Sequence, residues 1–391
     1  MVQYQRLRQI AIFLFERLLT LFVSIKKNRI TIVSRGYNGS NSVALYKLLP
    51  IIVSKNIDVM LVFPGKCRGK KARIRLLKRI ASSSILITTH GAYKYKRQQY
   101  CIELWHGFPL KGMSLMDRSL PYKQKRRVPI IWKYADMIAS YSSFYNTAMN
   151  SCIGIDNNKY KITGMPRNDL LLTSNGRENL SKLIGQPIKE KRIILFLPTY
   201  RQGYMGKIDG AKTSSNIFGF EIFDWKRFSG FLKNNDCHFF FKLHPNEELS
   251  LLDSLGTYSG APISFLSSNC FDDHGIDLYE VLGAADLLVT DYSSVYFDFL
   301  LLDRPIIFIP VDLEAYRSNR GFLLEPFSFW TPGPKVHNQT SLEKEIERCL
   351  LDPKYYKAER ELITPIIHFY QDSSSSKRIW KLIEQILRSL N

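Results

Sequence analysis

The stretch DLLVTDYSS at residues 286–294 runs directly into the apolar segment VYFDFLLL at residues 295–302. Its apolar part predicts a buried strand, and the polar turn after it predicts a helix that begins near Ser293. In an open α/β sheet, ligands bind at the carboxyl ends of strands, where such a turn lies. Amides and hydroxyls at a helix start bind anions. We therefore expect an α/β fold with an anion site here, unless Asp291 and the serines only cap the helix.

Short apolar runs of strand length recur along the chain with helical stretches between them, as is typical of parallel sheets. The first half holds such runs at residues 30–34, 59–63, 85–88, 101–104 and 137–139. The second half holds them at residues 193–197, 238–243, 287–290 and 306–309. The polar segment 173–191 separates the two sets, and 391 residues exceed the size of one ordinary core. We expect an N-terminal domain over 1–180, a C-terminal domain over 190–365 and a helical segment over 366–391.

The positive charge of the chain is concentrated at its N-terminal end. The net charge is +20, and residues 1–133 hold 27 Lys and Arg against 4 Asp and Glu. An excess confined to one third of the chain indicates an anionic partner for that third only. An anionic membrane surface and nucleic acid both fit this charge. Because no helix-turn-helix, RNP or zinc pattern accompanies it, we expect no nucleic-acid partner.

The apolar segment 10–23 is interrupted by Glu16 and Arg17. It is too short to span a bilayer, which takes about 20 apolar residues, and no signal-peptide cleavage site follows it. Basic residues flank its phenylalanines. This pattern suits a helix lying in the membrane interface, or an amphipathic helix packed on its own domain.

A second strand-to-turn segment, ELWHGFPLKG at residues 103–112, carries a histidine at the predicted strand end. We expect His106 to be exposed there, and titration near neutral pH suits imidazole to general-base work. A lone histidine is commonly structural. Gly107 and Lys111 favour the functional interpretation, because they would let a phosphate approach and neutralise it.

The segment FFFKLHPN at residues 239–246 places Lys242 and His244 on one face of a strand end. A cross-strand or capping role is the alternative. The segment LPTYR at residues 197–201 ends on Arg201, whose guanidinium suits a diphosphate.

The segment GMPRND at residues 164–169 contains Arg167 and Asp169. These two residues suit a salt-bridged turn better than a binding site. They are therefore expected to be structural.

The sequence gives no case for a metal or a cofactor. It contains no D-x-D stretch and no Cys/His cluster at zinc-ligand spacing. Its six cysteines lie far apart with no C-x-x-C pair, and they are predicted to be reduced thiols of a cytosolic protein.

Together these segments resemble the CDP-glycerol glycerophosphotransferase family of teichoic acid enzymes, over about residues 88–334. Five ordered motifs carry the resemblance: LWHGFPLK (104–111), GMPRND (164–169), LPTYR (197–201), TDYSS (290–294) and RGF (320–322). The resemblance implies a GT-B architecture, in which two Rossmann-like domains face each other across a cleft. It also implies a donor nucleotide in the C-terminal domain and a membrane-associated N-terminal domain.

The resemblance also implies roles for particular residues. His106 and His244 fall on catalytic positions of the family. The predicted donor-binding residues are Arg201, Lys242, Thr290, Asp291, Ser293, Ser294 and Arg320, and Gly107 and Lys111 are predicted to meet a phosphate or the acceptor.

The implied reaction transfers glycerol phosphate, or a related polyol phosphate, from CDP-glycerol or CDP-ribitol to a hydroxyl of a polyprenyl-diphosphate-linked saccharide, releasing CMP. It would serve cell-wall or capsule polymer synthesis, with the enzyme held peripherally on the cytoplasmic face of the cell membrane. His106 would take the hydroxyl proton, while His244, Lys242 and Arg201 offset charge on the phosphoryl oxygens. A GT-B glycosyltransferase using a nucleotide sugar shares the fold and is the alternative.

Overall fold

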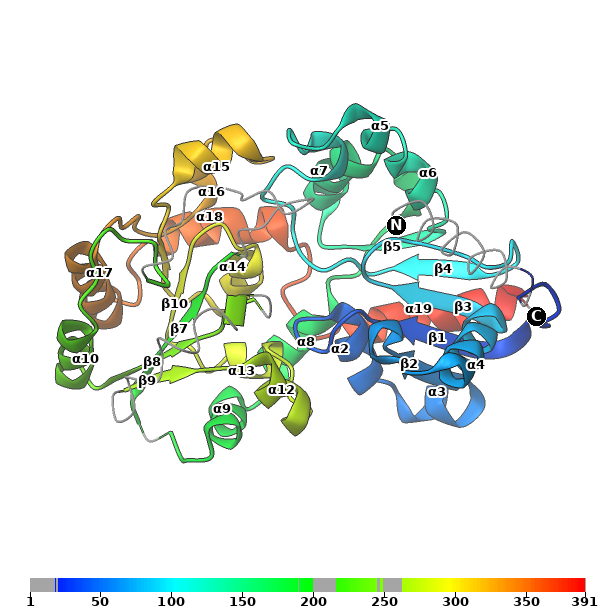
Figure 1. Cartoon of the computed structure of the whole chain (residues 1–391), viewed down its shortest axis with the longest axis horizontal. Coiled ribbons are helices and arrows are strands. Elements are labelled where there is room, and N and C mark those ends of the chain that lie inside the picture. Colours follow the sequence, from blue (N-terminus) through cyan, green and yellow to red (C-terminus); the bar gives the residue numbers. More distant parts are fainter. Residues whose placement is uncertain are drawn as a thin grey trace, which may run out of the picture.

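The computed structural model describes residues 18, 20–188, 190–199, 216–244, 247–248 and 262–390. Two parallel sheets lie side by side along the long axis of the molecule (Figure 1). The first has the order β2-β1-β3-β4-β5-β6, with β1 (Lys26–Val33), β2 (Asp58–Val62), β3 (Ser83–Thr88), β4 (Tyr100–Glu103), β5 (Met137–Ser140) and β6 (Tyr160–Ile162). The second has the order β11-β10-β7-β8-β9, with β7 (Arg192–Leu197), β8 (Cys237–Phe241), β9 (Ile263–Phe265), β10 (Leu287–Thr290) and β11 (Ile306–Phe308). The expected α/β fold with parallel sheets is confirmed.

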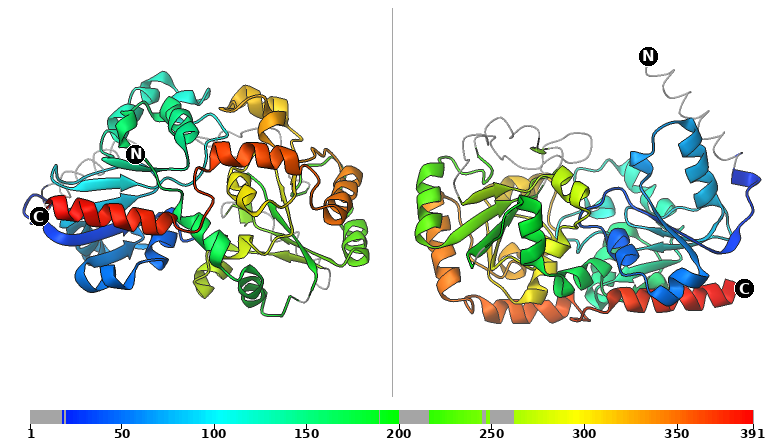
Figure 2. Two further views of the ribbon diagram at one scale, coloured as in Figure 1. Left: turned by 180° about the vertical axis from the view of Figure 1, so that it is seen from behind. Right: turned by 90° about the horizontal axis from the view of Figure 1, so that it is seen from below.

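Helices cover both sheets. In the first half these are α2 (Asn41–Lys47), α3 (Ile51–Asn56), α4 (Lys70–Ala81), α5 (Tyr122–Lys125), α6 (Val128–Trp132), α7 (Ser143–Ile153), α8 (Pro166–Thr173) and α9 (Gly176–Ile184). In the second half they are α10 (Trp225–Asn234), α12 (Ser268–His274), α13 (Tyr279–Leu282), α14 (Val295–Phe299), α15 (Leu313–Asn319), α16 (Phe327–Trp330), α17 (Gln339–Leu351), α18 (Lys357–Ile367) and α19 (Ser375–Leu390). The last two run along the back of the molecule, α18 against the second half and α19 against the first (Figure 2).

Each predicted strand overlaps an observed one, because each contains an apolar run of strand length; most of these runs are buried, whereas the edge strand β2 is largely not. All six residues of β3 and all four of β10 are buried. Sequence reasoning missed the edge strands β6 and β9. Each is three residues long and only partly buried, so neither contains an apolar run.

The segment 173–191, predicted to connect the two halves, includes the helix α9. The side chain of Asn175 caps it by accepting a hydrogen bond from the Glu178 amide, and Gly185 ends it in a left-handed conformation. Its buried face, with Leu180 and Leu183, packs toward α12 and α13. The domain boundaries placed around this segment stay a prediction.

The halves share one hydrophobic core, which extends from both faces of the first sheet to the near face of the second. Alternation along β8 divides its side chains between this core, which holds Phe240, and a second cluster, which holds Phe239 and Phe241. The carboxyl ends of the strands consequently face one another from two halves that are packed together.

The C-terminal segment 366–391, predicted to be helical, holds α19 over Ser375–Leu390. All six cysteines are free thiols. Within the described ranges, no helix combines the length and the apolar character needed to cross a bilayer. Most of the segment 10–23, predicted to form an interfacial or packed helix, lies outside those ranges.

Candidate active site

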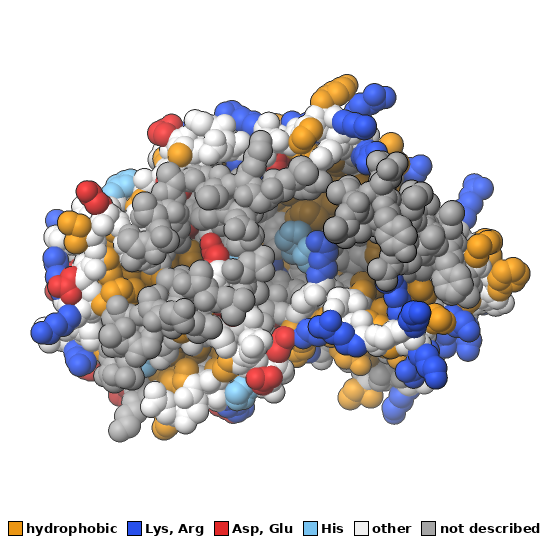
Figure 3. Space-filling view, in the orientation of Figure 1, with side chains coloured by type: hydrophobic (Ala, Val, Ile, Leu, Met, Phe, Trp, Pro, Cys, Tyr) orange, Lys and Arg blue, Asp and Glu red, His pale blue; other side chains and the backbone are white. Residues whose placement is uncertain are grey.

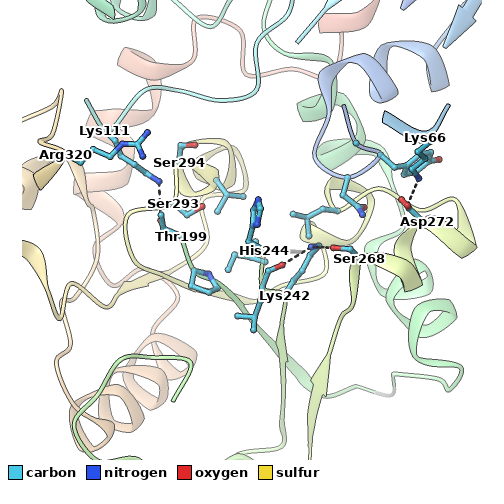
Figure 4. A pocket seen from close by; sticks show the side chains of 18 residues that line it. Lys66, Lys111, Thr199, Lys242, His244, Ser268, Asp272, Ser293, Ser294 and Arg320 are labelled. Carbon is cyan, nitrogen blue, oxygen red and sulfur yellow. Dashed lines mark hydrogen bonds and ion pairs between the residues drawn. The ribbon is translucent and has the colours of Figure 1, made fainter. Parts of the chain in front are cut away.

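A cavity of about 610 Å³ lies where the carboxyl ends of strands from both halves meet. Its wall is formed by residues 36–38 after β1, 197–199 at the end of β7, 242–244 after β8 and 293–295 after β10. This is the location at which open parallel sheets bind ligands. Figure 4 shows the side chains that line the cavity.

The cavity wall is positively charged. Its cationic side chains are those of Lys66, Lys111, Lys242 and Arg320, whereas its carboxylate is that of Asp272, which pairs with Lys66 at 2.5 Å. Lys111 and Arg320 lie together at one end of the cavity, and the Lys66–Asp272 pair lies at the other (Figure 4). Such a wall favours an anionic ligand at the end that holds Lys111 and Arg320.

The side chain of Lys242 is buried in the cavity wall, where hydrogen bonds hold its ammonium group. Its ammonium donates to Ser268 Oγ at 3.0 Å and to the Leu243 carbonyl at 3.1 Å, and it lies 3.6 Å from Glu248. Burial lowers the pKa of Lys242, although the Glu248 carboxylate opposes this shift. Its charge is therefore partly offset within the protein.

His244 is partly exposed and extends into the cavity from the end of β8 (Figure 4). Partial burial, and then the charge of Lys242, lower the pKa of its imidazole. His244 and Lys242 thus follow the end of the same strand, as predicted, and both line the cavity.

A smaller cavity of about 190 Å³ adjoins the first and is lined by residues 105–111 and by Met113. Lys111, Ser294 and Arg320 line both cavities. The segment that carries His106 is therefore brought against the serine turn after β10, although the two lie far apart in the sequence.

His106 is packed between two aromatic rings in this smaller cavity. The centroid of its ring lies 3.9 Å from that of Trp105 and 4.4 Å from that of His90, so it is less exposed than predicted. Its Nδ1 lies 2.8 Å from the Thr89 carbonyl oxygen. A carbonyl only accepts, so Nδ1 carries the hydrogen and Nε2 keeps a lone pair. Burial lowers the pKa of His106 to about 4, which leaves the ring neutral at pH 7.

Glu103 holds the turns on either side of this histidine. One carboxylate oxygen accepts the Trp105 amide at 3.0 Å, and the other accepts the Thr88 hydroxyl at 2.6 Å and the Gly91 amide at 3.1 Å. Trp105 has a positive φ of 52°, which these bonds help to maintain. Burial raises the pKa of Glu103 to about 7. Sequence reasoning missed this role, although an acidic residue closing an apolar strand was a visible signal.

Gly107 lies at a close contact between the two halves. A Cβ atom at this position would lie 2.9 Å from Ser294 Oγ and 3.2 Å from an Arg167 nitrogen, and its φ is 153°. The glycine is needed for this contact, beyond the phosphate approach predicted for it. Ser294 occupies the start of α14, but its side chain makes no capping hydrogen bond, so capping does not account for it.

Thr290 and Asp291 are not brought to either cavity wall. The Thr290 hydroxyl donates to the Leu197 carbonyl at 2.7 Å, and Asp291 Oδ1 accepts the amides of Thr199 at 2.7 Å and Tyr292 at 2.6 Å. Both side chains are buried and fasten the turn after β7 to the turn after β10. Their predicted contact with a donor stays a prediction, and Arg201 lies outside the described residues.

Arg167 and Asp169 are structural, as expected, but they do not form one salt-bridged turn. Arg167 pairs with Asp298 at 2.5 Å and donates to the His106 carbonyl at 2.7 Å. Asp169 instead accepts the first two backbone amides of α19, at 2.9 and 2.7 Å. Each side chain therefore joins distant parts of the chain.

Two parallel α/β halves that face each other across a cationic cavity have the architecture of GT-B enzymes. Residues 24–385 match the family described as CDP-Glycerol:Poly(glycerophosphate) glycerophosphotransferase. The chain belongs to this family of transferases, as the five motifs predicted.

Sequence comparison finds relatives named for teichoic acid synthesis. The chain is 26% identical over 387 residues to the teichoic acid glycerol-phosphate primase of Bacillus subtilis (strain 168), covering 95% of this chain and 93% of the relative. It is 25% identical over 352 residues to a teichoic acid poly(ribitol-phosphate) polymerase of Bacillus spizizenii, covering 85% of this chain and 52% of the relative. The chain thus spans about half the length of that polymerase.

Structural comparison supports the GT-B fold. The structure of the wall teichoic acid polymerase TagF superposes with a TM-score of 0.78 at 22% identity, covering 100% of this chain and 99% of that chain. A putative UDP-N-acetylglucosamine 2-epimerase from Listeria monocytogenes gives a TM-score of 0.51 at 14% identity, covering 93% of this chain and 98% of that chain. At these identities the likeness concerns the fold alone.

Proposed function

We propose that this protein transfers glycerol phosphate, or a related polyol phosphate, from a CDP-activated donor to a hydroxyl of a lipid-linked acceptor and releases CMP. The product would contribute to a cell-wall or capsule polymer. The observation that carries the proposal is that Lys111, Ser294 and Arg320 line both cavities. A phosphoryl group held by these three residues is open to a donor on one side and to the His106 cavity on the other.

The larger cavity suits the donor. Lys111 and Arg320 offset the charge of a diphosphate at one end, and the hydroxyls of Ser293 and Ser294 donate hydrogen bonds to its oxygens. In the reaction the acceptor oxygen bonds to the phosphorus next to the polyol, while the bond from that phosphorus to the bridging oxygen breaks. The bridging oxygen leaves with CMP. His244 and Arg320 would stabilise the charge on the phosphoryl oxygens.

His106 suits the role of general base. The Thr89 carbonyl fixes the hydrogen on Nδ1, so Nε2 accepts the proton of the attacking hydroxyl. Positioning and charge stabilisation dominate phosphoryl transfer, because its transition state is loose and needs little proton removal. A base with a lowered pKa is therefore sufficient.

The surface beside the His106 cavity suits a membrane-bound acceptor. Trp132 of α6 contacts Trp105 with a ring-centroid distance of 5.2 Å, which connects α6 to the cavity. Outside this contact, Ile130 and Ile131 are about half exposed. The neighbouring basic residues are Arg118, Lys123, Lys125, Arg126, Arg127 and Lys133, with no acidic residue from 118 to 135.

Exposed apolar and basic side chains on one surface are typical of proteins that bind anionic membranes. We therefore propose a peripheral position on the cytoplasmic face of the cell membrane. A polyprenyl-diphosphate-linked saccharide would present its hydroxyl there.

Donor screening tests the proposal. The protein is incubated with a synthetic polyprenyl-diphosphate saccharide and, separately, with CDP-glycerol, CDP-ribitol or nucleotide sugars. We expect CMP release with a CDP-polyol, together with a gain of one or more polyol phosphates in the acceptor mass. Transfer of a sugar from a nucleotide sugar, with no reaction of either CDP-polyol, would contradict the proposal and support a GT-B glycosyltransferase.

A further inference from the structure

A separate pocket of about 370 Å³ lies at the opposite end of β1 from the active-site cavity. It is formed by the start of β1 and the last turns of α4. Its basic side chains are those of Lys26, Arg29, Arg75, Lys78 and Arg79. The family motifs do not include this part of the chain, and the proposed reaction makes no use of it.

One carboxylate, that of Asp58, pairs with basic residues of this pocket. It accepts from Arg29 Nε at 2.8 Å and from Arg79 Nη1 at 2.6 Å, and both arginine side chains are largely buried. Arg79, and then Arg29, lower the pKa of Asp58. Lys26, Arg75 and Lys78 are exposed, and among the described residues no carboxylate forms an ion pair with them. The pocket therefore keeps a strong positive charge.

Exposed apolar side chains lie directly beside this pocket. Leu21 is 69% exposed and Phe22 is 88% exposed, and the next residue, Val23, lines the pocket. Basic and hydrophobic side chains gather at this end of the molecule (Figure 3). A site for nucleic acid or for a free anion needs no exposed Leu and Phe at its rim, whereas a lipid surface offers both a charged headgroup and an apolar layer.

We propose that this pocket binds the phosphate of an anionic lipid headgroup, with Leu21 and Phe22 in the bilayer interface. Arg75, Lys78 and Lys26 would contact the phosphate oxygens, and a guanidinium can do so with two parallel hydrogen bonds. Asp58 holds Arg29 and Arg79 in the wall. The inference rests on the proposed function in one respect, since it names the lipid contact of an enzyme proposed to work on a membrane.

The pocket and the active site are separate. The eight residues of β1 lie between them, which corresponds to about 25 Å at 3.3 Å per residue. A substitution in the pocket therefore leaves the groups around His106 and Ser294 untouched.

Vesicle binding tests the inference without donor or acceptor, so its outcome is independent of the proposed reaction. The full chain, the variant R75E/K78E and the matched control K70E/K71E are sedimented with vesicles of phosphatidylglycerol and phosphatidylcholine. Both variants reverse two exposed charges of α4, but Lys70 and Lys71 do not line the pocket. We expect R75E/K78E to lose on the order of tenfold or more in affinity, and the control to lose clearly less. Thermal unfolding checks that both variants fold, and R75Q/K78Q replaces R75E/K78E if it does not.

Two results would overturn the inference. Equal losses in both variants would mean that α4 attracts the membrane through diffuse charge without a defined pocket. Undiminished vesicle binding by a folded R75E/K78E protein that no longer binds inorganic phosphate, measured by calorimetry, would mean that the pocket takes a free phosphate and not a lipid headgroup.

Discussion

At the scale of single residues, His106 is held in one tautomer by a backbone acceptor and kept neutral by its surroundings. The Nδ1 hydrogen is donated to the Thr89 carbonyl, and the rings of Trp105 and His90 pack against the imidazole. The pKa is consequently about 4, well below the ordinary value near 6.5. Nε2 is the ring nitrogen left to receive a proton.

This pKa predicts the pH dependence of catalysis. Protonated imidazole has no lone pair, so activity requires the neutral form, which predominates above the pKa. We expect kcat/KM to stay level from about pH 8 to about pH 6 and to fall only below about pH 5. Steady-state kinetics across this range check the expectation. A fall in kcat/KM centred near pH 6.5 would show that the pKa of His106 is not lowered, or that His106 is not the base.

The histidine could be found from the sequence, but its supports could not. His106 was identified because it follows an apolar strand and stands beside Gly107 and Lys111. Thr89 acts through its backbone carbonyl. Every residue has one, so the sequence could not indicate that Thr89 is the acceptor. Glu103 gave a signal, but its partners lie in a turn that only the folded sheet brings near.

At the scale of elements, the helix that follows the β10 turn is too short to contribute much to anion binding. The helix α14 has five residues, so its dipole is small. We therefore expect the hydroxyls of Ser293 and Ser294 and the charges of Lys111 and Arg320 to hold a phosphate.

We expect Ser293→Ala combined with Ser294→Ala to weaken binding of CDP-glycerol about 30-fold. Each lost hydrogen bond to a phosphate oxygen removes on the order of 1 kcal/mol. Titration calorimetry with CDP-glycerol measures the change, and Ser389→Ala on α19 is the control. Undiminished affinity in the double variant would show that these serines do not contact the donor.

Strands and helices differed in how well the sequence predicted them. Buried strands such as β3 and β10 were found because both of their faces are apolar. The edge strands β6 and β9 were missed because each is only three residues long, and the helix α9 was missed because most of its residues are polar. Thr290 and Asp291 were placed at the correct strand end, but the sequence could not show that their side chains turn to the neighbouring β7 segment.

At the scale of the whole molecule, a buried ion pair joins the two halves. Arg167 of α8 pairs with Asp298 of α14, and the side chains are 5% and 0% exposed. Arg167 also donates to the His106 carbonyl, and the Tyr279 hydroxyl donates to Asp298 at 2.6 Å. The pair thereby fixes the histidine turn relative to the second half.

We expect Asp298→Asn to destabilise the whole protein, because it leaves the Arg167 charge buried and unpaired. Loss of one partner of a buried pair costs roughly 3–5 kcal/mol of the free energy of unfolding. Urea unfolding measures this change. The control Asp372→Asn breaks an exposed pair with Arg378 and should cost less than about 1 kcal/mol. Equal effects of the two substitutions would contradict this account of how the halves are joined.

The most direct test of the central claim is turnover of His106→Ala, measured as CMP release from CDP-glycerol with a lipid-linked acceptor. The control is His337→Ala, which alters an exposed histidine outside both cavities. We predict that His106→Ala lowers kcat on the order of 100-fold or more while the affinity for CDP-glycerol is kept, and that His337→Ala changes neither. Wild-type turnover by a folded His106→Ala protein would contradict the claim.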